Sequence, residues 1–283
     1  MNPRLSLLKN IARRLLRRGR YYPIAFGPLR GLRLQFNDHV TLGELLGLWE
    51  RNNFRVISLL NVAGLLESSS NTVLFDIGAN FGLYTLFFAK LLRGQGRIFA
   101  FEPADIPRQL LDANINANGM TNVVSEPLAV AGETEETHLY VGQSYHTSSL
   151  RAERAGTPMA QLRTIQVAST TLDDYWTRMQ GPGEKIALVK IDIEGAADAA
   201  LPSCSLIAQT ERCFFLIESH SPAEDAAIGE FARNGRYELY RTTNRKWVRN
   251  SFAVHPDADG VWGTLLLIPQ EKVRRAKTIL RDR

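Results

Sequence analysis

Residues 73–85 read VLFDIGANFGLYT, an apolar strand that runs through a glycine turn into a helix. Such a unit binds nucleotide-derived ligands, because glycines let the ligand approach the backbone and the helix N-terminus offers free N–H groups. Asn80 stands where the dinucleotide-binding motif G-x-G-x-x-G needs its second glycine. A pyrophosphate would lose its close approach there. The turn therefore favours S-adenosylmethionine, which carries no phosphate.

An acidic residue at the end of the next predicted strand supports this interpretation. Glu102 follows Gly82 by twenty positions, in the segment FAFEP, and is placed to accept hydrogen bonds from both ribose hydroxyls. Asp76, at the end of the first strand, is predicted to orient the ammonium end of the cofactor. Asn80 can both donate and accept there. The alternative is an α/β domain without a nucleotide, in which the turn is merely tight and Glu102 lies on the surface.

Strands alternate with helices from residue 71 onward, which predicts a parallel sheet with helices on both faces. The predicted helices cover residues 84–92, 106–118, 196–200 and 223–234, with another beginning at 172. The last two strands lack a helix between them and are predicted to pair antiparallel at one edge. The predicted strands are TVLFDI, GRIFAFEP, NVVSEPLAVA, ETHLYVG, RTIQVAST, IALVKIDI, CFFLIES, YELYRT and GVWGTLLLIP.

Basic charge is concentrated at the N-terminus of this 283-residue chain. Residues 1–20 contain seven basic side chains and no acid, so a net charge of +5 leaves +5 − 7 = −2 for the remainder. A nucleic-acid partner is not expected, because a binder would spread basic charge over its main domain. Two cysteines without a CxxC spacing fit a reduced, cytoplasmic setting. No apolar run is long enough for a spanning helix, and the N-terminus does not read as a signal peptide.

Residues 1–41 are predicted to form a basic amphipathic helix and a small helical and β cap. Leucines and alanines recur near helical spacing up to residue 16, with arginines between them. One interpretation is peripheral contact of residues 1–20 with the inner face of a membrane. The other is a helix packed on its own domain or on a partner chain. The main domain is expected over residues 42–270, beginning with one or two helices over 42–66. A basic helix or tail is expected over 271–283.

The segment IALVKIDIEGAADAAL places charged residues at the end of a predicted apolar strand. Lys190, Asp192 and Glu194 occupy alternate positions and share one face, which should look toward the cofactor site. Three charged groups brought together at this point cost free energy unless they bind a ligand, bind a metal or pair with one another. An ion pair of Lys190 with Asp192 or Glu194 that caps the sheet is the structural alternative.

The following strand ends in Glu218-Ser219-His220. His220 is the best-placed general base, since the unperturbed pKa of histidine lies close to working pH. An exposed loop histidine is the alternative. His146, in the polar loop GQSYHTSSL, competes for the role. A divalent metal held by Asp192 and a neighbouring carboxylate is an alternative to a base, although the sequence has no clean metal-ligand spacing and no metal ligands are assigned from it.

The ordered motifs resemble the FkbM family of methyltransferases. They are Trp49-Glu50, VLFDIGANFGLYT, FAFEP, TTLDDY, VKIDIEGA and FFLIESH, and they span residues 42–220. The resemblance implies a Rossmann-like class I α/β fold with a seven-stranded, mostly parallel sheet and an antiparallel edge strand. It also implies O-methylation of a hydroxyl on a sugar or natural product. The cofactor-binding residues expected on this basis are Glu50, Asp76, Gly78, Asn80, Phe81, Gly82 and Glu102. Asp192 and Glu194 would line the reactive site.

Three alternatives to O-methylation remain at this level. An N-methyltransferase of the same fold is one, although no NPPY-like motif stands where KIDIEG does. A second is a cofactor-binding domain without activity. An NAD-dependent dehydrogenase is disfavoured by Asn80. The expected partner is a small-molecule or glycan acceptor, bound in part by the polar loop around residues 144–150. The sequence predicts nothing about the oligomeric state.

Overall fold

Strand β3 (Thr72–Ile77) lies inside the main sheet and is buried along its whole length. Its sequence, TVLFDI, is nearly continuous in apolar residues, as expected for a parallel strand covered on both faces. It pairs in parallel with β4 (Arg97–Phe101) on one side and β9 (Lys185–Ile191) on the other. The computed structural model describes residues 16–37, 40–142, 148–154, 161–248 and 263–281.

The main sheet has eight strands in the described residues, not the seven that the resemblance implies. The additional strand is the two-residue β12, which pairs with β11 at the antiparallel edge. The predicted antiparallel pair is confirmed, with β13 inserted between β10 and β11. The order is β12 (Lys246–Trp247), β11 (Tyr237–Arg241), β13 (Gly263–Pro269), β10 (Phe214–Ser219), β9, β3, β4 and β5 (Val123–Glu126).

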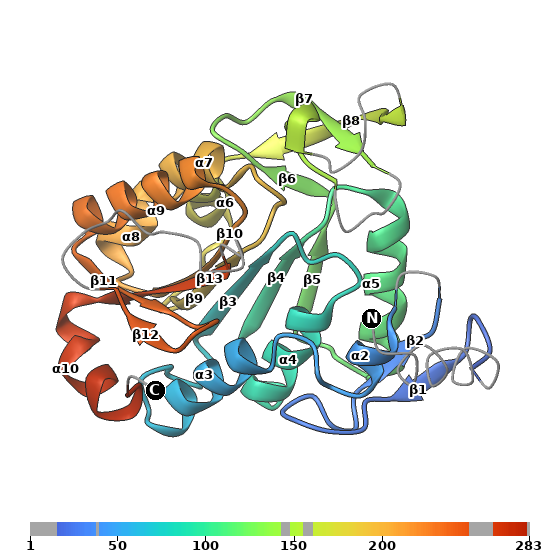
Figure 1. Cartoon of the computed structure of the whole chain (residues 1–283), viewed down its shortest axis with the longest axis horizontal. Helices are drawn as coiled ribbons and strands as arrows, with labels where there is room; N and C mark the ends of the chain where they lie inside the picture. The colour runs from blue at the N-terminus through green and yellow to red at the C-terminus, as the bar shows by residue number, and fades with distance from the viewer. Residues whose placement is uncertain (1–15, 38–39, 143–147, 155–160, 249–262, 282–283) are drawn as a thin grey trace.

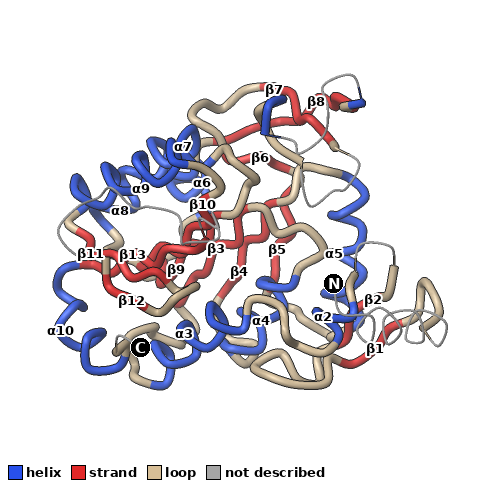
Figure 2. The backbone as a smooth tube through the Cα atoms, viewed as in Figure 1, coloured by secondary structure: helices blue, strands red, loops and turns tan. Residues whose placement is uncertain are grey.

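Helices cover both faces of this sheet, as Figures 1 and 2 show. One face carries α3 (Arg51–Val62), α4 (Leu83–Leu92), α5 (Asp105–Ala117) and α10 (Gln270–Ile279). The other carries α6 (Leu172–Met179), α7 (Ala197–Ala200), α8 (Ser205–Thr210) and α9 (Pro222–Gly235). Aromatic rings pack in both layers. The ring centroids of Phe75 and Phe99 lie 5.3 Å apart on one face, and those of Phe54 and Phe87 lie 4.8 Å apart on the other. None of the helices in the described ranges is long and apolar enough to cross a bilayer.

The segment NVVSEPLAVA, predicted as one strand, is two strands in two different sheets. β5 ends at Glu126, and β6 (Leu128–Val130) joins a separate three-stranded sheet with β8 (Arg163–Thr170) and β7 (Glu136–Val141). Pro127 separates them. Proline has no N–H for a ladder hydrogen bond, so it marks the point where the chain leaves one sheet for another. The small sheet lies beyond the carboxyl ends of β4 and β5 (Figure 1).

The N-terminal cap contains a short β-hairpin and a single helical turn. Strands β1 (Tyr21–Pro23) and β2 (Arg33–Gln35) pair antiparallel, and α2 (Leu42–Leu45) follows. The hairpin is tied to α5, because Asn114 and Asn118 accept hydrogen bonds from the backbone of β2. Most of the predicted basic helix, residues 1–15, lies outside the described residues. Residues 16–20 are not helical.

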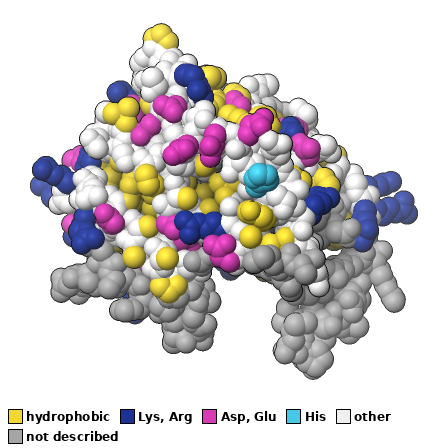
Figure 3. All heavy atoms as spheres, turned by 90° about the horizontal axis from the view of Figure 1, so that it is seen from above, with side chains coloured by type: hydrophobic (Ala, Val, Ile, Leu, Met, Phe, Trp, Pro, Cys, Tyr) yellow, Lys and Arg dark blue, Asp and Glu magenta, His cyan; other side chains and the backbone are white. Residues whose placement is uncertain are grey.

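One face of the molecule carries acidic and apolar side chains side by side. In the view of Figure 3, several Asp and Glu side chains gather beside apolar side chains near the middle.

The order of the strands determines where a ligand can bind. From β3 the chain proceeds to β4 and β5 on one side, whereas β9 and β10 occupy the other. The direction of winding therefore reverses between β3 and β9. Ligands of open α/β sheets bind at the carboxyl ends of the strands beside such a reversal.

Candidate active site

The turn after β3 is held close against the end of β9. Gly78 adopts φ +73°, and a Cβ built on it would lie 1.9 Å from the carbonyl oxygen of Asp192. The backbone N–H groups of Gly78 and Ala79 both donate to the carbonyl of Phe101, at 3.0 and 2.9 Å. Only glycine at position 78 allows the turn to contact both neighbouring strands.

Glu102 lies at the end of β4 with its carboxylate fixed by two backbone donors. The N–H of Asn80 donates to it at 2.8 Å and the N–H of Ala104 at 3.0 Å. Burial raises the pKa of Glu102 to about 7, against the opposing effect of these hydrogen bonds. The carboxylate therefore faces the cofactor turn in a defined orientation, as a ribose-binding group requires.

Lys190 lies beneath the turn and neutralises part of the acidic charge. Its Nζ is 3.3 Å from Asp76 Oδ1 and 3.6 Å from Asp192 Oδ2, and it donates to the carbonyl oxygen of Gly78 at 2.9 Å. Burial opposes its charge, but the carboxylates of Asp76 and Asp192 outweigh burial and raise the pKa of Lys190. The Lys190–Asp192 pair considered from the sequence is therefore present, and it lies within the crevice.

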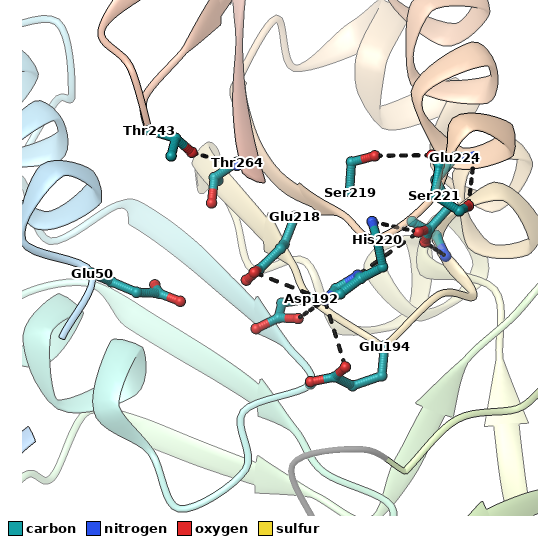
Figure 4. Close-up of polar contacts among 12 residues, drawn as sticks. Glu50, Asp192, Glu194, Glu218, Ser219, His220, Ser221, Glu224, Thr243 and Thr264 are labelled. Carbon is teal, nitrogen blue, oxygen red and sulfur yellow. Dashed lines mark hydrogen bonds and ion pairs between the residues drawn. The ribbon is translucent and has the colours of Figure 1, made fainter. Parts of the chain in front are cut away.

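Four ionisable groups converge at the ends of β9 and β10, as Figure 4 shows. The Nε2 atom of His220 is 3.5 Å from Glu194 Oε2 and 3.8 Å from both Asp192 Oδ1 and Glu218 Oε1. Burial, followed by the charge of Asp192, raises the pKa of Glu194 to about 8. The charge of Asp192 and then burial raise the pKa of Glu218 well above its usual value. The structure brings together all three predicted catalytic residues, His220, Asp192 and Glu194.

Glu50 approaches the same crevice from the first residue before α3. Its carboxylate accepts hydrogen bonds from the hydroxyl of Tyr84 and, at 3.2 Å, from Asn53 Nδ2. Burial and then the charge of Asp192 raise the pKa of Glu50. Asn53 also donates to Tyr84 and to Thr264, so it links α3, α4 and β13.

These groups surround a cavity of about 450 Å³, a size common for small-molecule sites. Among the described residues that line it, six are acidic and none is lysine or arginine: Glu44, Glu50, Glu102, Asp192, Glu194 and Glu218. Apolar lining comes from Ile77, Phe101, Pro103, Leu128 and Leu139, among others. Such walls suit a cationic ligand with an apolar ring and repel a pyrophosphate. The residues present therefore fit S-adenosylmethionine, with its sulfonium and ammonium charges.

The structure separates the predicted cofactor residues into two groups. Gly78, Asn80, Glu50 and Glu102 line the cavity. Asp76, Phe81 and Gly82 do not: Asp76 is fully buried, where it pairs with Lys190 and accepts a hydrogen bond from Thr85 at 2.6 Å. Phe81 is buried in the core, and Gly82 is the N-cap of α4. Asp76 therefore lies beneath the turn, whereas Phe81 and Gly82 belong to the turn itself.

Several residues of the site were not predicted from the sequence. The sequence predicts no role for Glu218, although its position, two residues before His220, places the two side chains on the same face of the chain. The contacts that bring Tyr84 and Asn53 into the site join distant parts of the chain: Tyr84 lies 31 residues from Asn53 and 34 from Glu50. The Asn53–Glu50 contact is local but gives no sequence pattern. His146 lies outside the described residues, whereas Ser148 and Leu150, at the end of its loop, line the cavity.

The sequence matches the family model described as the methyltransferase FkbM domain over residues 76–242. No curated protein sequence matches the chain. The match runs from the last two residues of β3 to the residue after β11, and so contains the turn after β3, Glu102, the end of β9 and His220.

Solved structures with low sequence identity are also similar. An FkbM methyltransferase from Methylobacillus flagellatus is 16% identical, with a TM-score of 0.46, over 72% of this chain and 45% of its own. An rRNA methylase from Streptococcus thermophilus is 14% identical, with a TM-score of 0.39, over 75% and 92%. An O-methyltransferase from Thermotoga maritima is 10% identical, with a TM-score of 0.38, over 75% and 63%. This chain therefore spans less than half the length of the Methylobacillus protein.

The family match excludes the dehydrogenase alternative, in agreement with Asn80 in the turn and the acidic cavity. The cofactor is S-adenosylmethionine. The chain belongs to the FkbM family of S-adenosylmethionine-dependent methyltransferases.

Proposed function

We propose that the protein methylates a hydroxyl oxygen of a carbohydrate or natural-product acceptor. The observation that carries this proposal is the convergence of Asp192, Glu194 and His220 beside the cofactor cavity. An alcohol is a poor nucleophile until its proton is removed, and the imidazole of His220 with two carboxylates within 4 Å of it offers several positions for that proton. An amine acceptor would have less need of such a cluster.

The reaction follows from the positions of these groups. Bound S-adenosylmethionine supplies a methyl group on positively charged sulfur. Glu102 would hold the ribose, while Lys190 pairs with Asp76 and Asp192 and holds both carboxylates in place. As the new carbon–oxygen bond forms and the carbon–sulfur bond breaks in line, the hydroxyl proton passes to the cluster at the ends of β9 and β10. Alignment of donor and acceptor supplies much of the rate enhancement.

A second cavity supports a carbohydrate acceptor. Its volume is about 740 Å³, and it shares Trp49, Glu50 and Glu218 with the cofactor cavity. The indole of Trp49 is half exposed, and Arg51 and Asn52 also line this space. An exposed aromatic face with polar donors around it suits the apolar and hydroxylated faces of a sugar ring.

Replacement of His220 tests the proposal. The full chain would be incubated with S-adenosylmethionine labelled in its methyl group and with sugars, glycans, lipid-linked sugars and amines. We expect transfer to a hydroxyl compound, and a His220→Ala variant that loses on the order of 10²–10⁴ in kcat while its calorimetric affinity for the cofactor is unchanged. His138→Ala, on the exposed face of β7, is the matched control and should keep full turnover.

Three results would contradict the proposal or part of it. Labelling of amines alone would replace O-methylation by N-methylation. Full turnover by His220→Ala would remove this side chain from proton transfer. Cofactor binding without transfer to any acceptor would favour the inactive-domain alternative.

A further inference from the structure

The ends of two adjacent strands bring three side chains of metal-binding type together. Asp192 follows β9, Glu218 lies on β10, and His220 follows β10. Each offers one ligand atom, and these atoms lie within 4.8 Å of one another. The Nε2 atom of His220 is 3.8 Å from both Asp192 Oδ1 and Glu218 Oε1. Figure 4 shows the three side chains pointing toward one another from neighbouring strands.

The negative charge around these groups exceeds the positive charge that the described residues supply. Glu50 and Glu194 add two further carboxyl groups, and Lys190 is the lysine in contact with the cluster. Lys190 already pairs with Asp76 and donates to the carbonyl of Gly78. Crowded carboxylates with so little compensation are costly unless they bind a cation or remain protonated.

Two buried polar atoms of these side chains have no hydrogen-bond partner among the described residues. They are Asp192 Oδ1, which faces the cluster, and His220 Nδ1, on the opposite side of the imidazole. His220 Nδ1 faces the buried carboxylate of Glu224, 3.8 Å away, while Nε2 faces the acidic cluster. Glu224 is held in place because it accepts hydrogen bonds from the N–H groups of Ala197 and His220. A histidine that binds a metal usually donates its other ring N–H to a carboxylate, and Glu224 is the carboxylate on that side of His220.

We propose that Asp192, Glu218 and His220 bind one divalent cation. Around such an ion, with bonds of about 2.1 Å, neighbouring ligand atoms lie about 3.0–3.4 Å apart. The two 3.8 Å distances from His220 Nε2 would therefore shorten by roughly 0.4–0.8 Å on binding, and the carboxylate oxygens of Asp192 and Glu218 would also move together from their present separation, which is within 4.8 Å. Two carboxylates and one imidazole suit Mn²⁺ as well as other divalent ions. Three protein ligands leave coordination positions open. In this proposal His220 is a metal ligand and not the general base that the sequence predicts.

The role of the cation rests on the proposed O-methylation. A hydroxyl of the acceptor at an open position would have its pKa lowered, as a metal-bound water does. Its proton would pass to Glu194, whose carboxylate lies 3.5 Å from His220 Nε2, as the methyl group moves from sulfur to oxygen and sulfur keeps the electron pair of the broken bond.

Titration of the full chain with Mn²⁺ alone tests the site independently of activity. Free Mn²⁺ would be measured by electron paramagnetic resonance, with and without S-adenosylhomocysteine. We expect one Mn²⁺ per chain, and binding at least tenfold weaker in Asp192→Asn, Glu218→Gln and His220→Ala. Asp105→Asn, an exposed carboxylate paired with Arg108 on α5, should bind like the wild type. Calorimetric binding of S-adenosylmethionine would show that each variant is folded.

Each outcome decides for or against the site. Absence of saturable binding up to about 1 mM, the weak end of carboxylate cation sites, would overturn the proposal. Undiminished binding by folded His220→Ala or Glu218→Gln would overturn it as well. If His220→Ala binds Mn²⁺ normally but loses turnover, His220 is a base and not a ligand. If Mn²⁺ binds as expected and no hydroxyl acceptor is methylated, the site stands and the proposed function fails.

Discussion

Three residues other than glycine adopt left-handed backbone conformations around the cofactor cavity. Glu50 has φ 45°, Asn80 has φ 51° and Glu194 has φ 49°. Such conformations cost of the order of 1–3 kcal/mol for side chains other than Asn or Asp, and they cluster where function requires a side chain in a particular direction. At Glu50 and Glu194 this backbone conformation directs the carboxylate into the crevice. A regular helix or strand at the same position would direct it elsewhere.

At the same scale, Glu102 should make cofactor binding depend on pH. The group must be ionised to accept both ribose hydroxyls, and its pKa in the free protein is raised to about 7 by burial. Affinity for S-adenosylmethionine should therefore be greatest at pH 7 and above and should fall as pH decreases from 7 to 5, by roughly tenfold for each pH unit. Calorimetry across this range measures the effect.

The control for this prediction is Glu102→Gln, which does not titrate. It should bind more weakly than the wild type at pH 7 and show a flat profile from pH 7 to 5. A flat profile for the wild type would show that Glu102 does not bind the ribose as an ionised group.

At the scale of elements, the site depends on contact between the β3 turn and the end of β9. A Cβ at position 78 would meet the carbonyl of Asp192 at 1.9 Å, whereas one at Gly119 meets nothing within 4 Å. Both glycines have positive φ, +73° and +63°. The two positions therefore share the backbone cost of alanine and differ in the clash.

Gly78→Ala should accordingly lose more stability than Gly119→Ala. Alanine with a positive φ costs roughly 1 kcal/mol of stability at each position. At position 78 its Cβ would also push the turn after β3 away from β9, which costs further stability. Urea unfolding measures the difference, and calorimetry should show loss of cofactor affinity in Gly78→Ala alone. Equal stability and affinity in the two variants would contradict the close contact.

At the scale of the whole molecule, the sheet edge is joined to its covering helix layer by a buried ion pair. Arg241 Nη2, at the end of β11, lies 3.1 Å from Asp225 Oδ2 of α9, and both side chains are buried. Removing one partner of such a pair leaves an uncompensated buried charge. The exposed Lys277–Glu238 pair between α10 and β11 provides the comparison.

Arg241→Met should lower the free energy of unfolding by about 3–5 kcal/mol. Lys277→Met should lower it by less than about 1 kcal/mol, because solvent screens exposed pairs. Denaturant titration of both variants checks the ranking. Similar values for the two would show that the Arg241–Asp225 pair does not hold α9 to the edge of the sheet.

Much of the fold was predictable because its signals are local. Apolar runs predicted the strands on both sides of the turn, and the missing helix between the last two strands predicted their antiparallel pairing. The break at Pro127 was missed, because a proline between two apolar segments does not reveal which sheet each will join. The eighth strand was missed because two residues, Lys246 and Trp247, leave no pattern. The roles of residues 1–20 and the cytoplasmic location stay predictions.

The sequence by itself determined the cofactor, since Asn80 in the glycine turn and Glu102 at the next strand end are both local, regularly spaced features. It also brought Asp192, Glu194 and His220 to the same edge, because parallel strands end together. Only the tertiary structure decided that Asp76 lies beneath the turn with Lys190, and that Glu50, Glu218 and Glu224 complete the acidic cluster. The reason is physical: such contacts depend on the register, burial and side-chain direction of elements far apart in the chain.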